Sequence, residues 1–233
     1  MATPLLLLPG MMCDARLFGP QIAAFSAERA VQCAPMRARS TFEIAEEILI
    51  HAPPRFALLG LSMGGIVAME IAAQAPECLA GLALLDTNPR AEIDTVKAAR
   101  APQIEGARAG KLASVMRDEM KPRYLADGPG KQSILDLCME MALKLGPDVF
   151  ESQSIALRDR PDRQETLRGL ECPSLVLMGR EDSLCPLDRH ELMASLLRGS
   201  TLEIIDGAGH LPVLEQPDAT NAALARWLEK CDG

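Results

Sequence analysis

The stretch that decides the fold is Phe56-Ala-Leu-Leu-Gly-Leu-Ser-Met-Gly-Gly65, in which an apolar run leads directly into a serine flanked by glycines. Phe56–Leu59 is short and continuously hydrophobic, as expected of a strand buried on both faces. Ser62–Ala75 is predicted to form a helix so apolar that it packs on most sides. Residues 60–64 read Gly-Leu-Ser-Met-Gly, the G-x-S-x-G pattern. Such a serine on a sharp strand-to-helix turn is typical of a nucleophile elbow.

On either side of this stretch, short apolar runs alternate with helical patterns. The predicted strands are Leu5–Leu8, Ala30–Ala34, Phe56–Leu59, Leu79–Leu85, Ser174–Met178 and Leu202–Ile205. Three further helices are predicted besides Ser62–Ala75. The first begins at Ser40, where the sequence has capping-box spacing, and stops at Pro53. The others are Leu187–Leu197 and a helix from Pro217 to about Glu229. The alternation predicts the α/β class, with a doubly wound, mainly parallel sheet of about six strands.

Residues 90–169 have a different character. They contain amphipathic helical patterns at Lys111–Met120 and Ser133–Lys144 and no good strand. They carry 14 basic and 13 acidic residues, whereas the rest of the chain carries 10 and 19. We therefore expect a core formed by residues 1–89 and 170–233, with residues 90–169 inserted as a helical cap over the carboxyl edge of the sheet, where open parallel sheets bind their ligands.

Composition excludes several classes of protein. With 24 basic and 32 acidic residues the net charge is −8, which argues against nucleic-acid binding. The 48% hydrophobic content is enough for a real core. Seven scattered cysteines without C-x-x-C spacing and three histidines predict reduced thiols and no metal centre. No basic residue precedes Arg16, and no apolar run approaches the ~18 residues of a membrane span, so we expect a cytoplasmic protein that does not bind membranes.

A nucleophilic serine needs a base to accept its proton, and three histidines are candidates. His51 lies at a helix end and His190 within a predicted helix, so both are expected to be solvated surface groups. His210 lies in Gly207-Ala-Gly-His-Leu-Pro212, directly after the predicted strand Leu202–Ile205. That position puts it on the same sheet edge as Ser62, so His210 is the expected base.

Two aspartates could orient this histidine, because each follows a predicted strand. Asp182 lies in Gly179-Arg-Glu-Asp-Ser183 and gives the chain order Ser, Asp, His; Asp86 follows Leu79–Leu85 and could also reach the edge. We favour Asp182 and regard Asp86 as the alternative, otherwise a turn or helix-cap residue.

The tetrahedral intermediate of acyl transfer needs two backbone N–H donors, an oxyanion hole. One is expected from Met63, which follows the serine. The other is expected from the loop Pro9-Gly-Met-Met12, with Met11 as the best-placed donor.

These motifs together resemble the α/β-hydrolase superfamily over nearly the whole chain. The resemblance rests on Leu5-Leu-Leu-Leu-Pro-Gly10, Gly60-Leu-Ser-Met-Gly-Gly65, Met178-Gly-Arg-Glu-Asp182 and Gly207-Ala-Gly-His210. Within it, the chain is most similar to small bacterial carboxylesterases of the kind that includes pimeloyl-carrier-protein methyl ester esterases. It differs in having Pro9-Gly10 where the family commonly has His-Gly, which affects loop shape rather than the triad. We also expect a minimal six-stranded sheet without the family's N-terminal antiparallel hairpin.

The expected function is hydrolysis of a small ester or thioester through an acyl-enzyme on Ser62, without a cofactor. The resemblance leaves open carbon–carbon bond hydrolysis, lyase and cofactor-free haloperoxidase chemistry on the same residues, and a non-catalytic small-molecule receptor of the same fold. Met11 and Met12 are expected to line an apolar acyl pocket together with cap residues. Binding of an anionic substrate or an acidic acyl-carrier protein would require several cap arginines to gather at the pocket mouth; the candidates are Arg100, Arg108, Arg117, Arg123 and Arg158.

Overall fold

The computed structural model describes residues 2–233, which are built around one six-stranded parallel sheet. The strand order is β2-β1-β3-β4-β5-β6, and every neighbouring pair is parallel. The sequence-based prediction of the α/β class and of six strands is confirmed. The strands are β1 (Leu5–Leu8), β2 (Val31–Cys33), β3 (Phe56–Leu61), β4 (Leu79–Leu85), β5 (Ser174–Gly179) and β6 (Thr201–Ile205).

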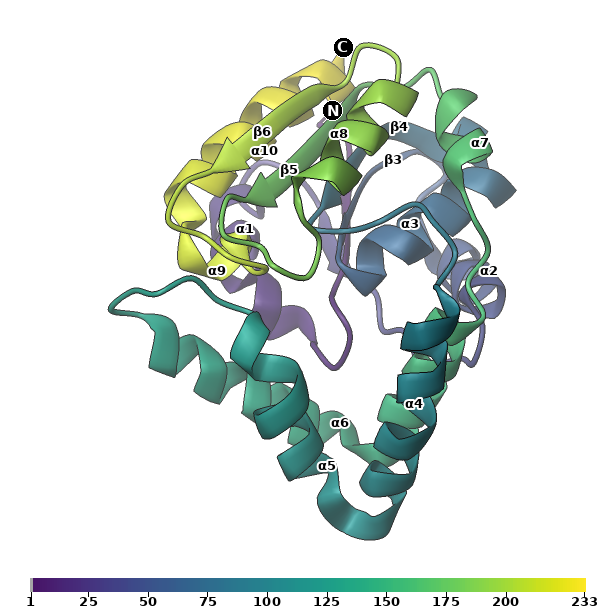
Figure 1. Ribbon diagram of the computed structural model, residues 1–233. Helices are drawn as coiled ribbons and strands as arrows, with labels where there is room; N and C mark the ends of the chain where they lie inside the picture. Colours follow the sequence, from purple (N-terminus) through teal and green to yellow (C-terminus); the bar gives the residue numbers. More distant parts are fainter. Residues whose placement is uncertain (1) are drawn as a thin grey trace.

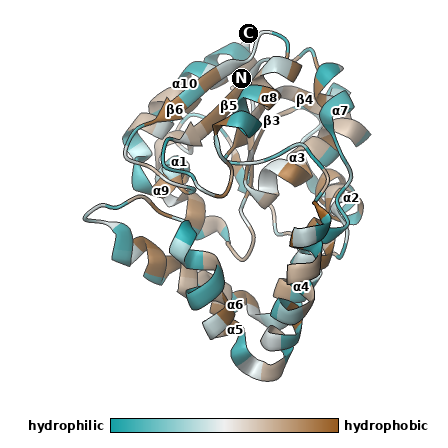
Figure 2. Cartoon of the chain, viewed as in Figure 1, coloured by the Kyte–Doolittle hydropathy of each residue, from teal (hydrophilic) through white to brown (hydrophobic). Residues whose placement is uncertain are grey.

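Helices cover both faces of the sheet, so the central strands are buried on both sides (Figure 1). On one face of the sheet, apolar side chains of α2, α3 and α8 pack with every second strand residue in one hydrophobic cluster. On the other face, apolar side chains of α1, α9 and α10 pack with the remaining strand residues in a second cluster. Figure 2 shows the strands as predominantly hydrophobic, whereas the outer helices also carry hydrophilic residues. These helices are α1 (Gly19–Phe25), α2 (Thr41–His51), α3 (Met63–Gln74), α7 (Gln164–Arg168), α8 (Leu187–Leu196), α9 (Pro212–Glu215) and α10 (Pro217–Asp232).

The strand order reverses between β1 and β3. The chain first adds β2 on one side of β1, and it then adds β3 and all later strands on the other side. Leu8, the last residue of β1, pairs with Gly60 near the end of β3. The loops that leave these two strands therefore diverge at one point of the carboxyl edge, the position where open α/β sheets form a ligand crevice.

The residues from 90 to 169 are largely helical and lie beyond the ends to which the strand arrows point (Figure 1). The predicted helix at Ser133–Lys144 is part of a longer element that continues beyond a break at Gly146. Gly146 has a φ of 83° and is followed by a proline. The predicted helix at Lys111–Met120 is shorter and less regular than expected. The elements here are α4 (Asp94–Gly106), η3 (Ala107–Lys111), α5 (Leu112–Ser114), η4 (Val115–Met120), η5 (Lys121–Arg123) and α6 (Lys131–Arg158), with the single turns η1 (Ala15–Phe18) and η2 (Pro76–Cys78) elsewhere in the chain.

Two further findings concern the chain as a whole. All seven cysteines are free thiols. Among the helices formed by residues 2–233, none combines the length and the hydrophobicity that crossing a lipid bilayer requires.

Candidate active site

Ser62 occupies the turn between β3 and α3 in a backbone conformation that side chains rarely adopt. Its φ is 55° and its ψ is −115°. A non-glycine residue in such a conformation stores strain and persists only where the surroundings enforce it. A Cβ on Gly60 would lie 2.3 Å from the carbonyl oxygen of Gly64, and one on Gly64 would lie 1.9 Å from that of Leu8. Both flanking glycines are therefore required by backbone that passes too close for any side chain.

Hydrogen bonds from the neighbouring strand hold the strained serine in place. The Ser62 N–H donates to the carbonyl oxygen of Leu85 (2.9 Å), and the Thr87 hydroxyl donates to the carbonyl oxygen of Ser62 (2.7 Å). Thr87 also explains the third glycine of the motif, because a Cβ on Gly65 would lie 2.6 Å from its side chain. The peptide groups on both sides of Ser62 are thus fixed by hydrogen bonds, and rotation of its side chain is the remaining freedom of this residue.

The structure brings Ser62, His210 and Asp182 into one hydrogen-bonded chain. His210 Nε2 lies 2.8 Å from Ser62 Oγ, and His210 Nδ1 lies 2.9 Å from Asp182 Oδ2. A carboxylate only accepts hydrogen bonds, so Nδ1 carries the proton and the unprotonated Nε2 faces the serine hydroxyl. This is the arrangement that general-base activation of a serine requires.

The Asp182 carboxylate is buried, yet it is held in its charged form. Burial by itself would raise its pKa, but hydrogen bonds from His210 and from the backbone N–H groups of Cys185 and Leu184 outweigh burial, so the pKa lies below its usual range. Its side chain is fully screened from solvent. An ionised carboxylate in this position stabilises a positive charge on the imidazole.

Asp86, the alternative acid, does not bond to the histidine. Its Oδ1 accepts a hydrogen bond from the Gly179 N–H (2.9 Å), and its Oδ2 is buried without a hydrogen-bond partner among the described residues. Burial, followed by the nearby charge of Asp182, raises the pKa of Asp86 well above its usual range. The pKa values of the two aspartates at this edge of the sheet are therefore shifted in opposite directions, down for Asp182 and up for Asp86.

The two other histidines differ in burial. His51 is exposed at the end of α2, as predicted. The prediction that His190 is a solvated surface group is wrong: it is completely buried, and its Nδ1 faces the carbonyl oxygen of Pro186 at 3.3 Å. Burial lowers the pKa of His190 to about 4, so it is neutral near pH 7. The polar neighbours of His190 in its helix suggested a surface residue, but the imidazole points to the inner side.

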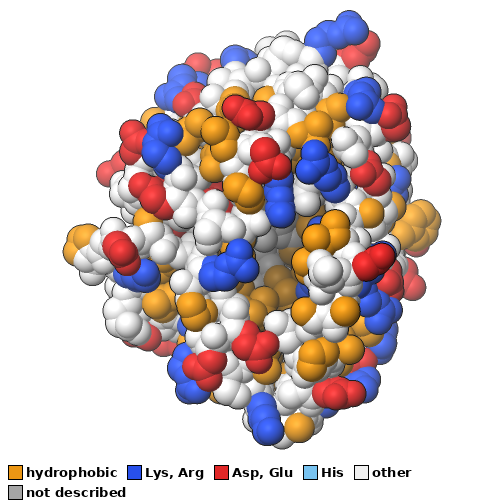
Figure 3. Space-filling model, in the orientation of Figure 1, with side chains coloured by type: hydrophobic (Ala, Val, Ile, Leu, Met, Phe, Trp, Pro, Cys, Tyr) orange, Lys and Arg blue, Asp and Glu red, His pale blue; other side chains and the backbone are white. Residues whose placement is uncertain are grey.

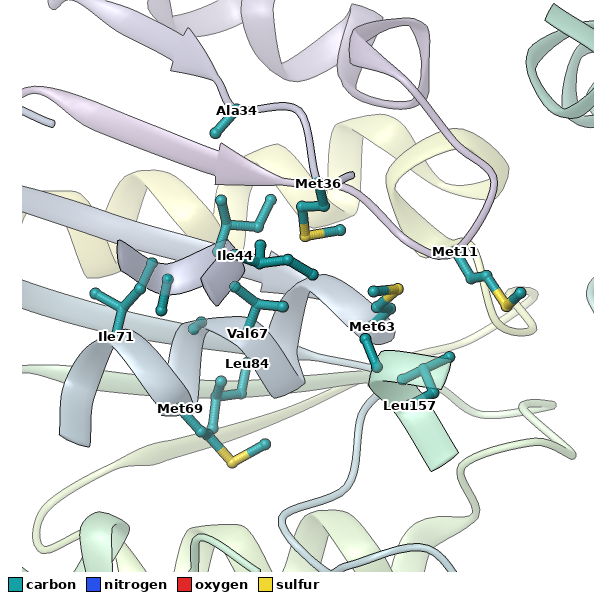
Figure 4. Packing of buried hydrophobic residues seen from close by; sticks show 14 of the residues in the cluster. Met11, Ala34, Met36, Ile44, Met63, Val67, Met69, Ile71, Leu84 and Leu157 are labelled. Atoms are coloured by element: carbon teal, nitrogen blue, oxygen red, sulfur yellow. The ribbon is translucent and has the colours of Figure 1, made fainter. Parts of the chain in front are cut away.

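The backbone N–H groups of Met11 and Met63 are both unpaired within residues 2–233. Met63 is the first residue of α3, so the positive end of the helix dipole adds to its N–H. Figure 4 shows the side chains of both methionines in one hydrophobic cluster, in which Leu157 also lies. An oxyanion hole requires two free backbone donors of this kind.

A buried glutamine that sequence reasoning missed shapes the Met11 loop. The Gln153 side chain, from α6, accepts a hydrogen bond from the Met12 N–H (2.8 Å) and donates one to the carbonyl oxygen of Met36 (2.9 Å). Met12 has a φ of 58°, so the loop turns sharply there. Met12 is consequently packed away from the cavity rather than lining it, contrary to the prediction, whereas Met11 does line it.

A glutamate that sequence reasoning also missed organises the loop around His210. The Glu215 carboxylate accepts hydrogen bonds from the backbone N–H groups of Gly209 (2.9 Å), Leu211 (2.9 Å) and Ala126 (2.8 Å). Burial raises the pKa of Glu215, although these three bonds oppose the effect. The N–H of His210 donates to the carbonyl oxygen of Tyr124 (2.6 Å). The histidine loop is thus bound to the chain that follows η5.

A cavity of about 260 Å³ opens onto Ser62 and His210. Figure 3 shows a hollow near the centre of this face, with hydrophobic side chains inside it and basic side chains beside it. Of the five arginines considered from the sequence, only Arg100 and Arg123 line this cavity. The lining residues are Gly10, Met11, Cys13, Leu61, Ser62, Val96, Ala99, Arg100, Gln103, Glu119, Met120, Arg123, Tyr124, Leu157, Leu184, His210 and Leu211.

One group of side chains within residues 2–233 has donor atoms close enough together to hold a metal ion. These are Asp182, Cys185 and His210, whose donor atoms lie within 4.8 Å of one another. Asp182 and His210 already bond to each other, and burial raises the pKa of the Cys185 thiol far above its usual range. A thiol must lose its proton to bind a metal, so these residues fit the hydrogen-bonded chain better than a metal site.

Comparison with known proteins supplies the family. Residues 5–223 match the family described as the alpha/beta hydrolase family. The chain belongs to the alpha/beta hydrolase family. The resemblance inferred from its motifs is thereby confirmed, and the protein is a hydrolase.

Three relatives illustrate where this alpha/beta hydrolase lies within the family. The pimeloyl-[acyl-carrier protein] methyl ester esterase of Yersinia pseudotuberculosis is 27% identical over 191 residues, covering 78% of this chain and 72% of the relative. That of Neisseria meningitidis is 24% identical over 181 residues, covering 74% and 68%. The solved structure of a thermophilic esterase from Thermogutta terrifontis, with malate bound, superposes with a TM-score of 0.91 at 28% identity and covers 100% of this chain and 92% of that one.

Proposed function

We propose that this alpha/beta hydrolase cleaves a small carboxylic ester or thioester through an acyl-enzyme on Ser62. The observation that carries the proposal is the chain of contacts from Ser62 Oγ through His210 to Asp182, which opens onto a largely apolar cavity. Residues 90–169 act as the cap of the core formed by residues 1–89 and 170–233, because they supply much of the cavity wall.

In the first half of the reaction, Ser62 Oγ attacks the carbonyl carbon of the substrate as His210 Nε2 takes its proton. The N–H groups of Met11 and Met63 stabilise the negative charge that develops on the carbonyl oxygen. The tetrahedral intermediate then collapses, and the leaving alcohol or thiol takes the proton from His210. Asp182 keeps the imidazole in the required tautomer and stabilises its transient positive charge.

In the second half, water replaces the alcohol or thiol. His210 Nε2 removes a proton from the water, whose oxygen attacks the acyl carbon, and a second tetrahedral intermediate forms. The bond between the acyl carbon and Ser62 Oγ breaks, the proton returns from His210 to the serine, and a carboxylic acid leaves. No cofactor takes part, since these residues supply the nucleophile, the base and the charge stabilisation.

The relatives support an ester as the substrate. The two enzymes from Yersinia pseudotuberculosis and Neisseria meningitidis are methyl ester esterases, and the structural relative is an esterase. At 24–28% identity, the type of bond is the part of their function that we carry over to this chain.

The test is a hydrolysis panel of aryl esters of increasing acyl length together with acyl thioesters. We expect the wild type to hydrolyse at least one ester and Ser62→Ala to lose about 10⁴-fold or more in kcat. Ser195→Ala removes a hydroxyl that is exposed on α8 and serves as the control, with unchanged activity. Mass spectrometry of the quenched wild type should show the acyl group on the peptide that contains Ser62. Full activity in Ser62→Ala would contradict the covalent mechanism.

A further inference from the structure

Three charged side chains are buried together beside the cavity. Glu92 precedes α4, Arg100 lies within α4, and Arg160 follows α6. The Glu92 carboxylate accepts hydrogen bonds from Arg100 through Nε and Nη2, the latter at 2.6 Å, and from Arg160 Nη1 at 2.6 Å. The exposed fractions of the side chains are 3% for Glu92, 12% for Arg100 and 10% for Arg160. This cluster therefore lies almost entirely out of bulk water.

The cluster holds one more positive charge than negative. Both guanidinium groups are charged at any ordinary pH, and they share a single carboxylate. Burial lowers the pKa of Arg160 even though Glu92 opposes the effect, and Arg100 lowers it further. A buried charge without a counter-charge is costly, so this cluster is more stable when an anion approaches it.

Arg100 is the member of the cluster that reaches the cavity. It lines the cavity together with Ser62, and its Nη1 donates to no acceptor among residues 2–233. Arg123 lines the cavity too, is exposed, donates one hydrogen bond to the carbonyl oxygen of Ser183 (3.1 Å), and forms no ion pair with the part of the chain that the structure describes.

The cavity offers little negative charge of its own. Glu119 is its one acidic lining residue; it is exposed and accepts a hydrogen bond from Gln103 (3.1 Å). The apolar side chains that line the cavity with Arg100 and Ser62 include Leu157 and Ala99. The cavity thus combines an ester-cleaving group, an apolar wall and an incompletely neutralised cation.

We propose that Arg100 binds a carboxylate carried by the substrate, so that the preferred substrates are monoesters of short dicarboxylic acids. This inference rests on the proposed ester hydrolysis at Ser62 and adds the class of acyl group. The methylene chain of the substrate packs on the apolar wall while its ester reaches Ser62 Oγ. Its free carboxylate accepts a charge-assisted hydrogen bond from Arg100 Nη1, with Arg123 adding attraction from the rim.

The first experiment compares matched esters with the wild-type protein. Monomethyl succinate, glutarate and adipate are paired with methyl butyrate, valerate and hexanoate, which have the same acyl length and a methyl group in place of the carboxylate. We expect kcat/KM to favour the anionic member by about 10-fold or more at one chain length, mainly through KM. Free adipate should inhibit hydrolysis of a neutral aryl ester competitively, whereas 1,6-hexanediol should not.

The second experiment removes the cation. Arg100→Gln leaves Glu92 paired one-to-one with Arg160, so the fold should survive, as thermal unfolding will show. We expect this variant to lose the preference, so that its kcat/KM for the anionic ester falls to that for the neutral ester of the same acyl length. Arg117→Gln is the matched control, because Arg117 also lies among residues 90–169, in η4, pairs with Asp118 in solvent and does not line the cavity.

The outcomes separate this inference from the function on which it rests. Hydrolysis of neutral esters without any preference for anionic ones would overturn the inference and leave the proposed function standing. Binding to Ser62→Ala, measured by calorimetry, needs no turnover: at the preferred chain length the anionic ester should bind more tightly than its neutral counterpart, and Arg100→Gln in the same background should abolish the difference. Equal binding of the two esters to Ser62→Ala would also overturn it.

Discussion

At the scale of single residues, the pKa values of two neighbouring aspartates are shifted in opposite directions. His210 and two backbone N–H groups lower the pKa of Asp182, whereas burial raises the pKa of Asp86, which accepts one backbone hydrogen bond, from Gly179. An amide oxygen can accept that single bond as well. The two residues should therefore respond very differently to replacement by asparagine.

We predict that Asp182→Asn lowers kcat by about 10³-fold or more, because a neutral amide gives the imidazolium no negative charge and its N–H₂ group can favour the wrong tautomer of the imidazole. Asp86→Asn should change kcat by less than about 3-fold, since Asp86 does not bond to His210 and an amide oxygen can accept the bond from the Gly179 N–H. Steady-state kinetics with one ester at pH 7 measure both variants. A larger loss in Asp86→Asn would reverse our assignment of the acid.

The buried His190 makes a prediction about stability and pH. Its folded pKa of about 4 lies below the unfolded value near 6.5, so the unfolded chain binds more protons between these values. The stability that this site contributes is complete above pH 6.5 and is lost as pH falls towards 4, by about 2 kcal/mol at pH 5. Urea unfolding at pH 7 and pH 5 should show that the wild type loses this amount more than His190→Leu does. His51→Leu, at an exposed position, should behave like the wild type.

A single residue could be predicted from the sequence where a short motif or its place after a strand identifies it. Ser62 is specified by a five-residue motif, and His210 and Asp182 follow from their places after predicted strands. His190, Gln153 and Glu215 carry no such signal, because a polar residue in a helical pattern usually faces solvent. Their burial depends on partners 4 to 141 residues away in the chain, and these partners are set only by the complete fold.

At the scale of elements, the elbow depends on close contact between backbone segments. We predict that Gly64→Ala destabilises the protein by about 3 kcal/mol or more and abolishes activity, because its Cβ would lie 1.9 Å from the carbonyl oxygen of Leu8. Gly19→Ala is the matched control, since nothing lies within 4 Å of its Cβ and its φ is −48°; its unfolding free energy should stay within about 1 kcal/mol of the wild type. Denaturant unfolding of both variants decides the matter, and a stable, active Gly64→Ala would contradict the geometry.

The strands were the most predictable elements, since continuous apolar runs such as Leu5–Leu8 leave few alternatives to a buried strand. The predicted strand Ala30–Ala34 is shorter in the structure, at Val31–Cys33, because it lies at the sheet edge with a partner on one side only. Among residues 90–169, breaks at Gly110 and Gly146, with φ of 81° and 83°, interrupt the helical period and make element boundaries hard to infer.

At the scale of the whole molecule, the Glu215 carboxylate joins the loop that carries His210 to Ala126, which lies among residues 90–169. We predict that Glu215→Gln lowers stability by about 2 kcal/mol and kcat by about 10-fold, because an amide cannot accept all three of the backbone hydrogen bonds that Glu215 accepts. Thermal unfolding and steady-state kinetics measure the two effects. Glu229→Gln, exposed on α10, should change neither. Wild-type kcat in Glu215→Gln would show that the loop needs no such anchor.

The main-chain bond between Tyr124 and His210 couples access to chemistry. Tyr124 lines the cavity, and its carbonyl oxygen accepts the hydrogen bond from the N–H of the residue that carries the imidazole. A substitution that moves the Tyr124 main chain is therefore expected to move the His210 imidazole relative to Ser62 Oγ as well, so that the shape of the cavity wall and the geometry of the hydrogen-bonded chain cannot vary independently.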